Sequence, residues 1–89
     1  MNESETILNR IREQISESLG IDSEEVHHHS RLVQDLGAES IDLIDLVFRF
    51  EIAFDMKLPE NFHLDEVRQG RGDLTVQMIA EDIEQRLSA

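Results

Sequence analysis

Apolar residues recur at helical spacing along most of this chain, and this periodicity restricts the fold more than any other feature. Between residues 4 and 19 the apolar positions lie three or four residues apart, with polar side chains between them. The same spacing returns after Ser40 and again after Thr75. No stretch alternates with a period of two for long enough to indicate a strand. The pattern therefore predicts an all-α protein.

Glycine and proline divide this pattern into four helices. The expected helices are residues 4–19, residues 40–54, a short one at residues 60–69, and a last one that opens at Thr75. A long loop joins the first two, and a loop of this length must be anchored to the core of so small a domain. Its expected anchors are Ile21, Val26, Leu32, Val33 and Leu36. Residues 1–89 are thus predicted to form a single domain, a four-helix bundle with three longer helices and one short one.

Length and charge restrict the classes of function. A chain of 89 residues buries one modest core and is too small for a deep enzyme pocket. Its 20 acidic and 8 basic residues give a net charge of -12, which would repel nucleic acids and anionic membranes. The absence of cysteine excludes disulfides and thiolate chemistry from the chain itself. We expect a cytoplasmic monomer whose partners carry basic patches, without nucleic-acid binding or membrane insertion.

Ser40 is the strongest candidate for a functional side chain. It follows the glycine turn at Gly37 and opens the second helix. The first turn of a helix has unpaired N–H groups and a positive dipole end, which favour a phosphate on a hydroxyl placed there. The ordinary alternative is that Ser40 is only an N-cap, because serine is among the preferred N-cap residues.

The segment Asp35-Leu36-Gly37-Ala38-Glu39-Ser40-Ile41 resembles the acyl carrier protein family, whose motif is usually Asp-Leu-Gly-x-Asp-Ser-Leu. The resemblance covers most of the chain. It implies a four-helix bundle that holds an acyl thioester on 4'-phosphopantetheine attached to Ser40 and delivers it to separate enzymes. The chain itself would then not be an enzyme. Implied partners are a phosphopantetheinyl transferase and the acyl-transferring or chain-extending enzymes of fatty acid or lipid synthesis.

Three departures from the family pattern suggest a specialised discrete carrier. Glu39 replaces the usual Asp before the serine, and Arg49 and Ile52 stand where typical members are small or acidic. The interval from Pro59 to Thr75 is also several residues longer than usual. We expect a gap beside the second helix that accepts long acyl chains. Its expected lining is Ile44, Ile52, Phe62 and Leu64.

The second helix carries two apolar arcs, although a bundle helix needs only one for the core. Leu43, Leu46, Val47, Phe50, Ala53 and Phe54 form the first, and Ile41, Ile44, Phe48 and Ile52 the second. For Ile44 and Ile52, burial and exposure both remain open. Ile41 and Phe48 are expected to be exposed beside acidic residues that steer a basic partner. The predicted partner-binding residues are Glu39, Ile41, Asp42, Ile44, Asp45 and Phe48.

Two other functions are weaker. The run His27-His28-His29 suggests a metal site, but consecutive residues point in different directions, so a solvated loop is favoured and no metal site is expected. A hydrolase triad lacks both Gly-x-Ser-x-Gly and a pocket. The remaining alternative is a non-acylated acidic adaptor that binds a protein partner through the second helix.

Overall fold

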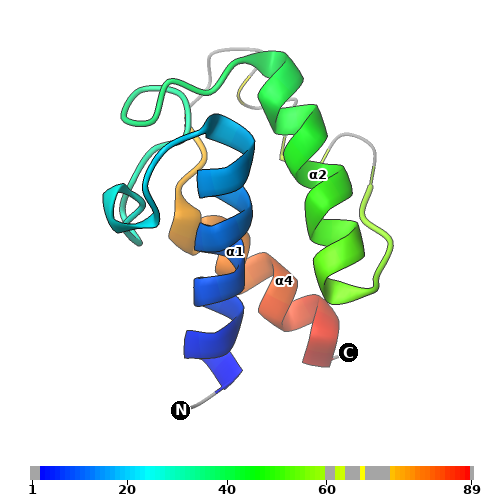
Figure 1. The fold of residues 1–89 in the computed structure, drawn as a ribbon. Helices are drawn as coiled ribbons and strands as arrows, with labels where there is room; N and C mark the ends of the chain where they lie inside the picture. Colours follow the sequence, from blue (N-terminus) through cyan, green and yellow to red (C-terminus); the bar gives the residue numbers. More distant parts are fainter. Residues whose placement is uncertain (1–2, 60–61, 64–66, 68–72, 89) are drawn as a thin grey trace.

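The computed structural model describes residues 3–59, 62–63, 67 and 73–88. These residues contain three α-helices and one 3₁₀-helix, which are α1 (Glu3–Leu19), η1 (Ser23–Glu25), α2 (Ser40–Phe54) and α4 (Val76–Ser88) (Figure 1). Within these ranges there is no strand, and the all-α prediction is confirmed. The short helix expected at residues 60–69 falls largely outside the described residues, so the count of four helices stays a prediction.

Helix α1 packs against both α2 and α4. Its apolar face is buried through Ile7, Ile11 and Ile15, as the periodicity predicts. Gly20 ends the helix with a φ of +68°, and the Ile21 N–H donates to the Ser16 carbonyl oxygen at 3.1 Å. This is the left-handed C-terminal geometry that glycine adopts at low cost.

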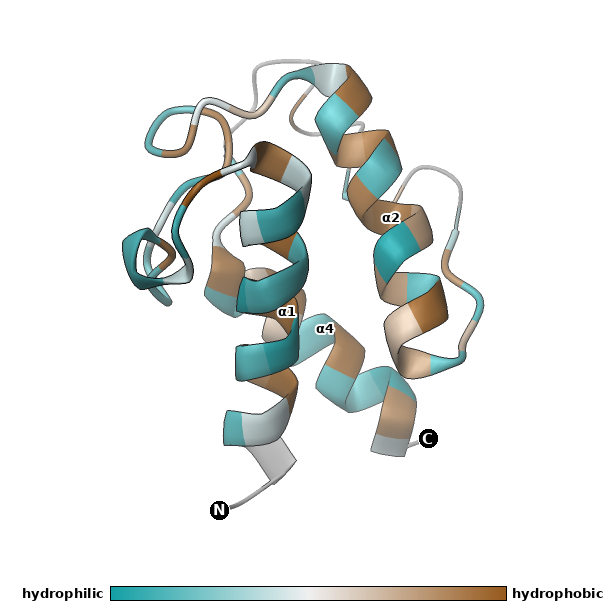
Figure 2. Cartoon of the chain, in the orientation of Figure 1, coloured by the Kyte–Doolittle hydropathy of each residue, from teal (hydrophilic) through white to brown (hydrophobic). Residues whose placement is uncertain are grey.

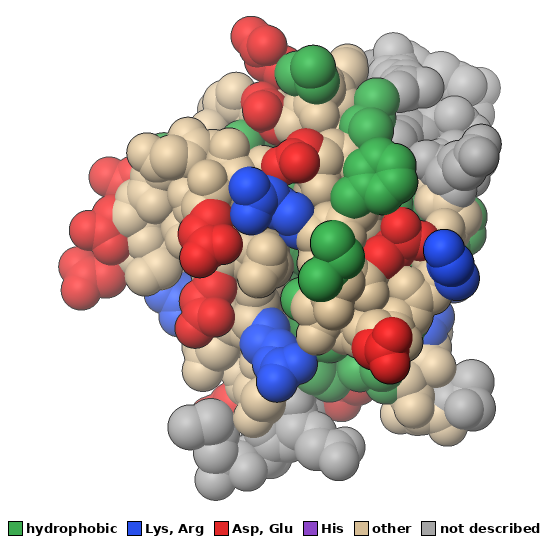
Figure 3. Space-filling model, turned by 45° about the vertical axis from the view of Figure 1, so that its right-hand side comes forward, with side chains coloured by type: hydrophobic (Ala, Val, Ile, Leu, Met, Phe, Trp, Pro, Cys, Tyr) green, Lys and Arg blue, Asp and Glu red, His purple; other side chains and the backbone are tan. Residues whose placement is uncertain are grey.

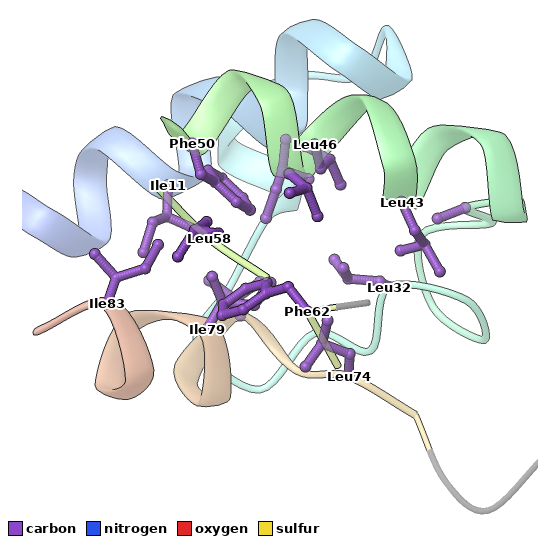
Figure 4. Packing of buried hydrophobic residues seen from close by; sticks show 14 of the residues in the cluster. Ile11, Leu32, Leu43, Leu46, Phe50, Leu58, Phe62, Leu74, Ile79 and Ile83 are labelled. Atoms are coloured by element: carbon purple, nitrogen blue, oxygen red, sulfur yellow. The ribbon is translucent and has the colours of Figure 1, made fainter. Parts of the chain in front are cut away.

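One hydrophobic core lies between α1, α2 and α4, and Figure 4 shows its side chains pointing toward one another. In Figure 2 the helices carry both apolar and polar segments along their length, as amphipathic helices do. The core arc of α2 is the predicted one, since Leu43, Leu46, Val47 and Phe50 are buried. The start of α1 and the ends of α2 and α4 meet around an open hollow of about 480 Å³.

The loop between α1 and α2 is attached to the start of α4 by backbone hydrogen bonds. The Leu32 N–H donates to the Leu74 carbonyl oxygen at 2.9 Å, and the Val76 N–H donates to the Ser30 carbonyl oxygen at 3.2 Å. The Asp73 carboxylate accepts from the N–H groups of Val33 and Gln34 at 3.1 and 2.9 Å. The loop is therefore a fixed part of the fold.

Four of the five expected loop anchors contact the core. Val26 and Leu32 are buried, while Ile21 and Leu36 are partly buried and pack against the core. Val33 was expected there too, but its side chain is exposed. The reason is that its backbone N–H is directed to Asp73, which holds this turn at the surface.

Thr75 caps the last helix, as the sequence indicates. Its Oγ1 accepts a hydrogen bond from the Met78 N–H at 3.2 Å, which satisfies one of the unpaired N–H groups of the first turn. The buried face of α4 then consists of Val76, Ile79 and Ile83.

Candidate functional site

The first turn of α2 is capped by Glu39 and not by Ser40. Glu39 has the extended backbone of an N-cap residue, with φ −100° and ψ 170°. Its N–H donates to Asp42 Oδ2 at 2.8 Å, which is the reciprocal bond of a capping box. The alternative that Ser40 is the N-cap is therefore wrong, because Ser40 is the first residue inside the helix.

The Ser40 side chain is exposed, and its hydroxyl makes no hydrogen bond to any residue that the structure describes. The segment before it is held firmly, because Ala38 is buried and its N–H donates to the Leu32 carbonyl oxygen at 2.8 Å. Gly37, with a φ of +73°, makes the turn into this segment. A phosphate joined to the Ser40 oxygen would stand in solvent at the positive end of a 15-residue helix.

The second apolar arc of α2 is on the surface. The exposed fractions are 72% for Ile41, 39% for Ile44, 60% for Phe48 and 82% for Ile52. The expected exposure of Ile41 and Phe48 is confirmed. Ile44 and Ile52, for which burial and exposure were both open, are exposed as well. Figure 3 shows hydrophobic side chains exposed on this side of the molecule among acidic and basic ones. We call Ile41, Ile44, Phe48 and Ile52 the outer stripe.

Asp45, beside the outer stripe, is paired within the chain. Its Oδ2 accepts from Arg49 Nε at 2.7 Å and from Ser18 Oγ at 2.8 Å. Arg49 also lies 3.5 Å from Glu17 on α1. These hydrogen bonds, first from Arg49 and then from Ser18, lower the pKa of the Asp45 carboxyl below its usual range. Asp45 thus has less free charge for steering than its sequence position suggests.

Among the described residues, one cavity beneath α2 is very small. A cavity of about 10 Å³ lies under the helix, which is room for at most one water molecule. Its lining is Leu32, Leu43, Leu46, Val47, Phe50, Phe62, Leu74 and Ile79. The gap expected at Ile44 and Ile52 is therefore wrongly placed, because both residues lie on the outer stripe. Of the expected lining only Phe62 is present, and Leu64 lies outside the described residues.

The three consecutive histidines are exposed. The rings of His28 and His29 meet edge to face with centroids 5.9 Å apart. Across the described part of the chain, no group of three or more His, Cys, Asp or Glu side chains is placed to hold a metal ion. None of the described helices is long and apolar enough to cross a membrane.

Two comparisons agree with this site. A family model described as a phosphopantetheine attachment site matches residues 9–66, a range that contains Ser40. The chain is 42% identical over 60 residues to an acyl carrier protein of Thermotoga maritima, and the match covers 67% of this chain and 74% of that protein. The chain therefore belongs to the acyl carrier protein family, whose members are carriers rather than enzymes and whose cofactor is 4'-phosphopantetheine.

Proposed function

We propose that this protein holds an acyl thioester on 4'-phosphopantetheine attached to Ser40 and delivers it to partner enzymes of fatty acid or lipid synthesis. The observation that carries the proposal is the position of Ser40 as the exposed first residue of α2, with a hydroxyl that caps nothing. Because Glu39 and Asp42 supply the cap, esterification of Ser40 leaves the helix end intact.

The protein and its cofactor have separate tasks. The cofactor supplies a terminal thiol, which this cysteine-free chain lacks. Ser40 supplies only the oxygen of the phosphodiester. The positive dipole end at the start of α2 would stabilise the negative charge of the phosphate, by about 0.3 to 1 kcal/mol at an exposed site.

The outer stripe is the proposed docking surface for the transferase and for the acyl-handling enzymes. Ile41 and Phe48 would supply the apolar contact, with Ile44 between them. Glu39 and Asp42 would attract basic patches, and Asp45 would contribute less because Arg49 neutralises it. We further propose a cytoplasmic monomer whose cargo is a long acyl chain that inserts beneath α2, where the lining of the cavity is entirely apolar.

Intact mass measured after coexpression with phosphopantetheinyl transferases tests the attachment. The wild type should gain one phosphopantetheine group, and Ser40→Ala should gain none. Ser23→Ala is the matched control, since Ser23 is also exposed but opens the short η1 turn, and it should be modified like the wild type. A modified Ser40→Ala protein would reject the assignment. A wild type left unmodified by every transferase, yet still binding a partner through α2, would favour the adaptor.

A further inference from the structure

The Phe62 side chain packs in the core under α2. Its ring is buried and lines the small cavity opposite Leu46, next to Leu32 and Leu74. Figure 4 shows the Phe62 ring between α2 and α4. The volume of this one cavity, about 10 Å³, is too small for an alkyl chain.

Side chains of α4 hold Phe62 and its neighbour in place. The Arg86 guanidinium lies 5.5 Å from the centroid of the Phe62 ring, within the range of a cation–π contact. His63 Nε2 lies 2.6 Å from Asp82 Oδ2, and Arg86 Nε donates to Asp82 Oδ1 at 2.8 Å. The carboxylate of Asp82 therefore joins His63 and Arg86, so the Phe62–His63 pair is attached to α4 at two points.

We propose that Phe62 determines which acyl chains this carrier buries. An acyl chain enters the core by displacing the Phe62 ring, and the contacts with Arg86 and Asp82 oppose that displacement. A short acyl chain stays in solvent, whereas a long one takes the place of the Phe62 ring in the core. This inference rests on the proposed function, because it requires an acyl cargo on Ser40.

The chain length at which this exchange occurs follows from buried apolar surface. Burying one phenylalanine side chain stabilises a fold about as much as burying two to four methylene groups. An acyl chain must therefore bury about that many methylenes before it offsets the loss of the ring, and more to offset the contacts with α4. Beyond that length, each further methylene stabilises the protein.

A series of acyl groups of increasing length, loaded on the phosphopantetheine of the full chain, tests this. The readout is the melting temperature against carbon number. The melting temperature of the wild type should not rise until the acyl chain is longer than about two to four methylenes, and it should then rise steadily with each further methylene. In Phe62→Ala the rise should begin with the shortest chains, because the space is already vacant. Phe54→Ala is the control, since Phe54 lines the hollow at the other end of α2 and not this cavity, and it should keep the wild-type onset.

A second variant leaves the core unchanged. Asp82→Asn removes the carboxylate that contacts His63 and pairs with Arg86, and it should shift the onset to shorter chains, whereas Glu81→Gln on the exposed side of α4 should not. In the wild type carrying a long chain, nuclear Overhauser contacts from the Phe62 ring to Leu32 and Leu74 should disappear.

The outcomes separate this inference from the proposed function. A wild type that accepts no phosphopantetheine rejects the proposed function before any acyl group is compared. If the melting temperature of the loaded wild type begins to rise at the same chain length as in Phe62→Ala and Asp82→Asn, the role of Phe62 is rejected and the proposed function is not. A Phe62 ring that keeps its contacts under the longest chain rejects that role as well.

Discussion

The Ser40 hydroxyl takes no part in the capping box at the start of α2, which is made by Glu39 and Asp42. Glu39 is the cap residue, and the Asp42 carboxylate receives the Glu39 N–H. The Ser40 oxygen is therefore free of any structural role that the described residues reveal. A substitution at Ser40 should therefore leave the stability of α2 almost unchanged, whereas a substitution in the capping box should lower it.

Ser40→Ala should change the free energy of unfolding by no more than about 0.5 kcal/mol, because it removes an exposed hydroxyl that bonds to none of the described residues. Asp42→Ala should lower it by about 1 kcal/mol, since the Glu39 N–H loses its acceptor. Urea denaturation of the two variants measures both values. A loss of 1 kcal/mol or more in Ser40→Ala, roughly that of a lost cap, would contradict the capping described here.

Phe48 and Phe50 provide a matched pair on opposite sides of α2. Phe48→Ala should cost less than about 1 kcal/mol of stability and weaken binding to partner enzymes, because Phe48 belongs to the outer stripe. Phe50→Ala should cost about 3 to 5 kcal/mol, since Phe50 is fully buried. Denaturation and a binding assay with the transferase measure the two effects. Similar stability losses in both variants would place the outer stripe in the core.

At the scale of elements, the contact between α1 and α2 includes the cluster of Ser18, Asp45 and Arg49. The folded state lowers the pKa of Asp45, so its contribution to stability is present above the unfolded pKa of about 3.9 and is lost as pH falls through the folded value. The stability difference between wild type and Asp45→Asn should therefore shrink as pH falls from about 5 to about 2. This difference in the free energy of unfolding should be small, since the side chains of Asp45 and Arg49 are both partly exposed. Denaturation over this pH range checks it, and a difference that widens toward acid would refute the sign.

Asp73 connects the loop to the beginning of α4. Asp73→Ala leaves the N–H groups of Val33 and Gln34 without their acceptor, which should cost about 1 to 3 kcal/mol if they are not fully rehydrated. The rate of amide hydrogen exchange at these two residues should increase more than the rate at the buried Leu32. Asp22→Ala is a control, because Asp22 caps only the local η1 turn. Unchanged exchange in Asp73→Ala would show that the loop is anchored by other contacts.

The sequence predicted the three described α-helices because the apolar spacing within each helix is local. The bounds of α2 and both of its arcs follow from residues only three or four apart. The Asp45–Arg49 ion pair has the same short spacing, but it was not predicted from the sequence, where Asp45 was assigned to partner binding alone. The exact cap was not predicted, because Glu39, Ser40 and Asp42 compete over one turn and a serine is the better cap on average.

Contacts between distant residues were the part that sequence patterns did not predict. The bonds from Asp73 to Val33 and Gln34 span about forty residues, and His63 meets Asp82 across a separation of 19. Ile44 and Ile52 were assigned from the sequence to the lining of an expected gap, and their exposure was missed for a related reason. Both arcs of α2 are apolar, and the arc that faces inward is decided by packing against α1 and the rest of the core, which local spacing does not reveal.

At the scale of the whole molecule, the net charge of -12 opposes folding by self-repulsion. The melting temperature should rise with added salt and more steeply with divalent cations, because both screen that repulsion. Calorimetry of the unmodified protein at several ionic strengths measures the rise. A melting temperature that does not respond to salt would show that charge does not limit stability.

The beginning of α1 and the end of α4 lie at the same end of the molecule, beside the end of α2, whereas Ser40 lies at the other end (Figure 1). Helix α2 has 15 residues, so about 22 Å separates the two ends. A dye, a bead or a sensor surface coupled at either end of the chain would therefore stand well away from the serine. Immobilised in this orientation, the protein would leave the Ser40 end of α2 facing the solution, so that binding of an added protein to that end should be observable one molecule at a time.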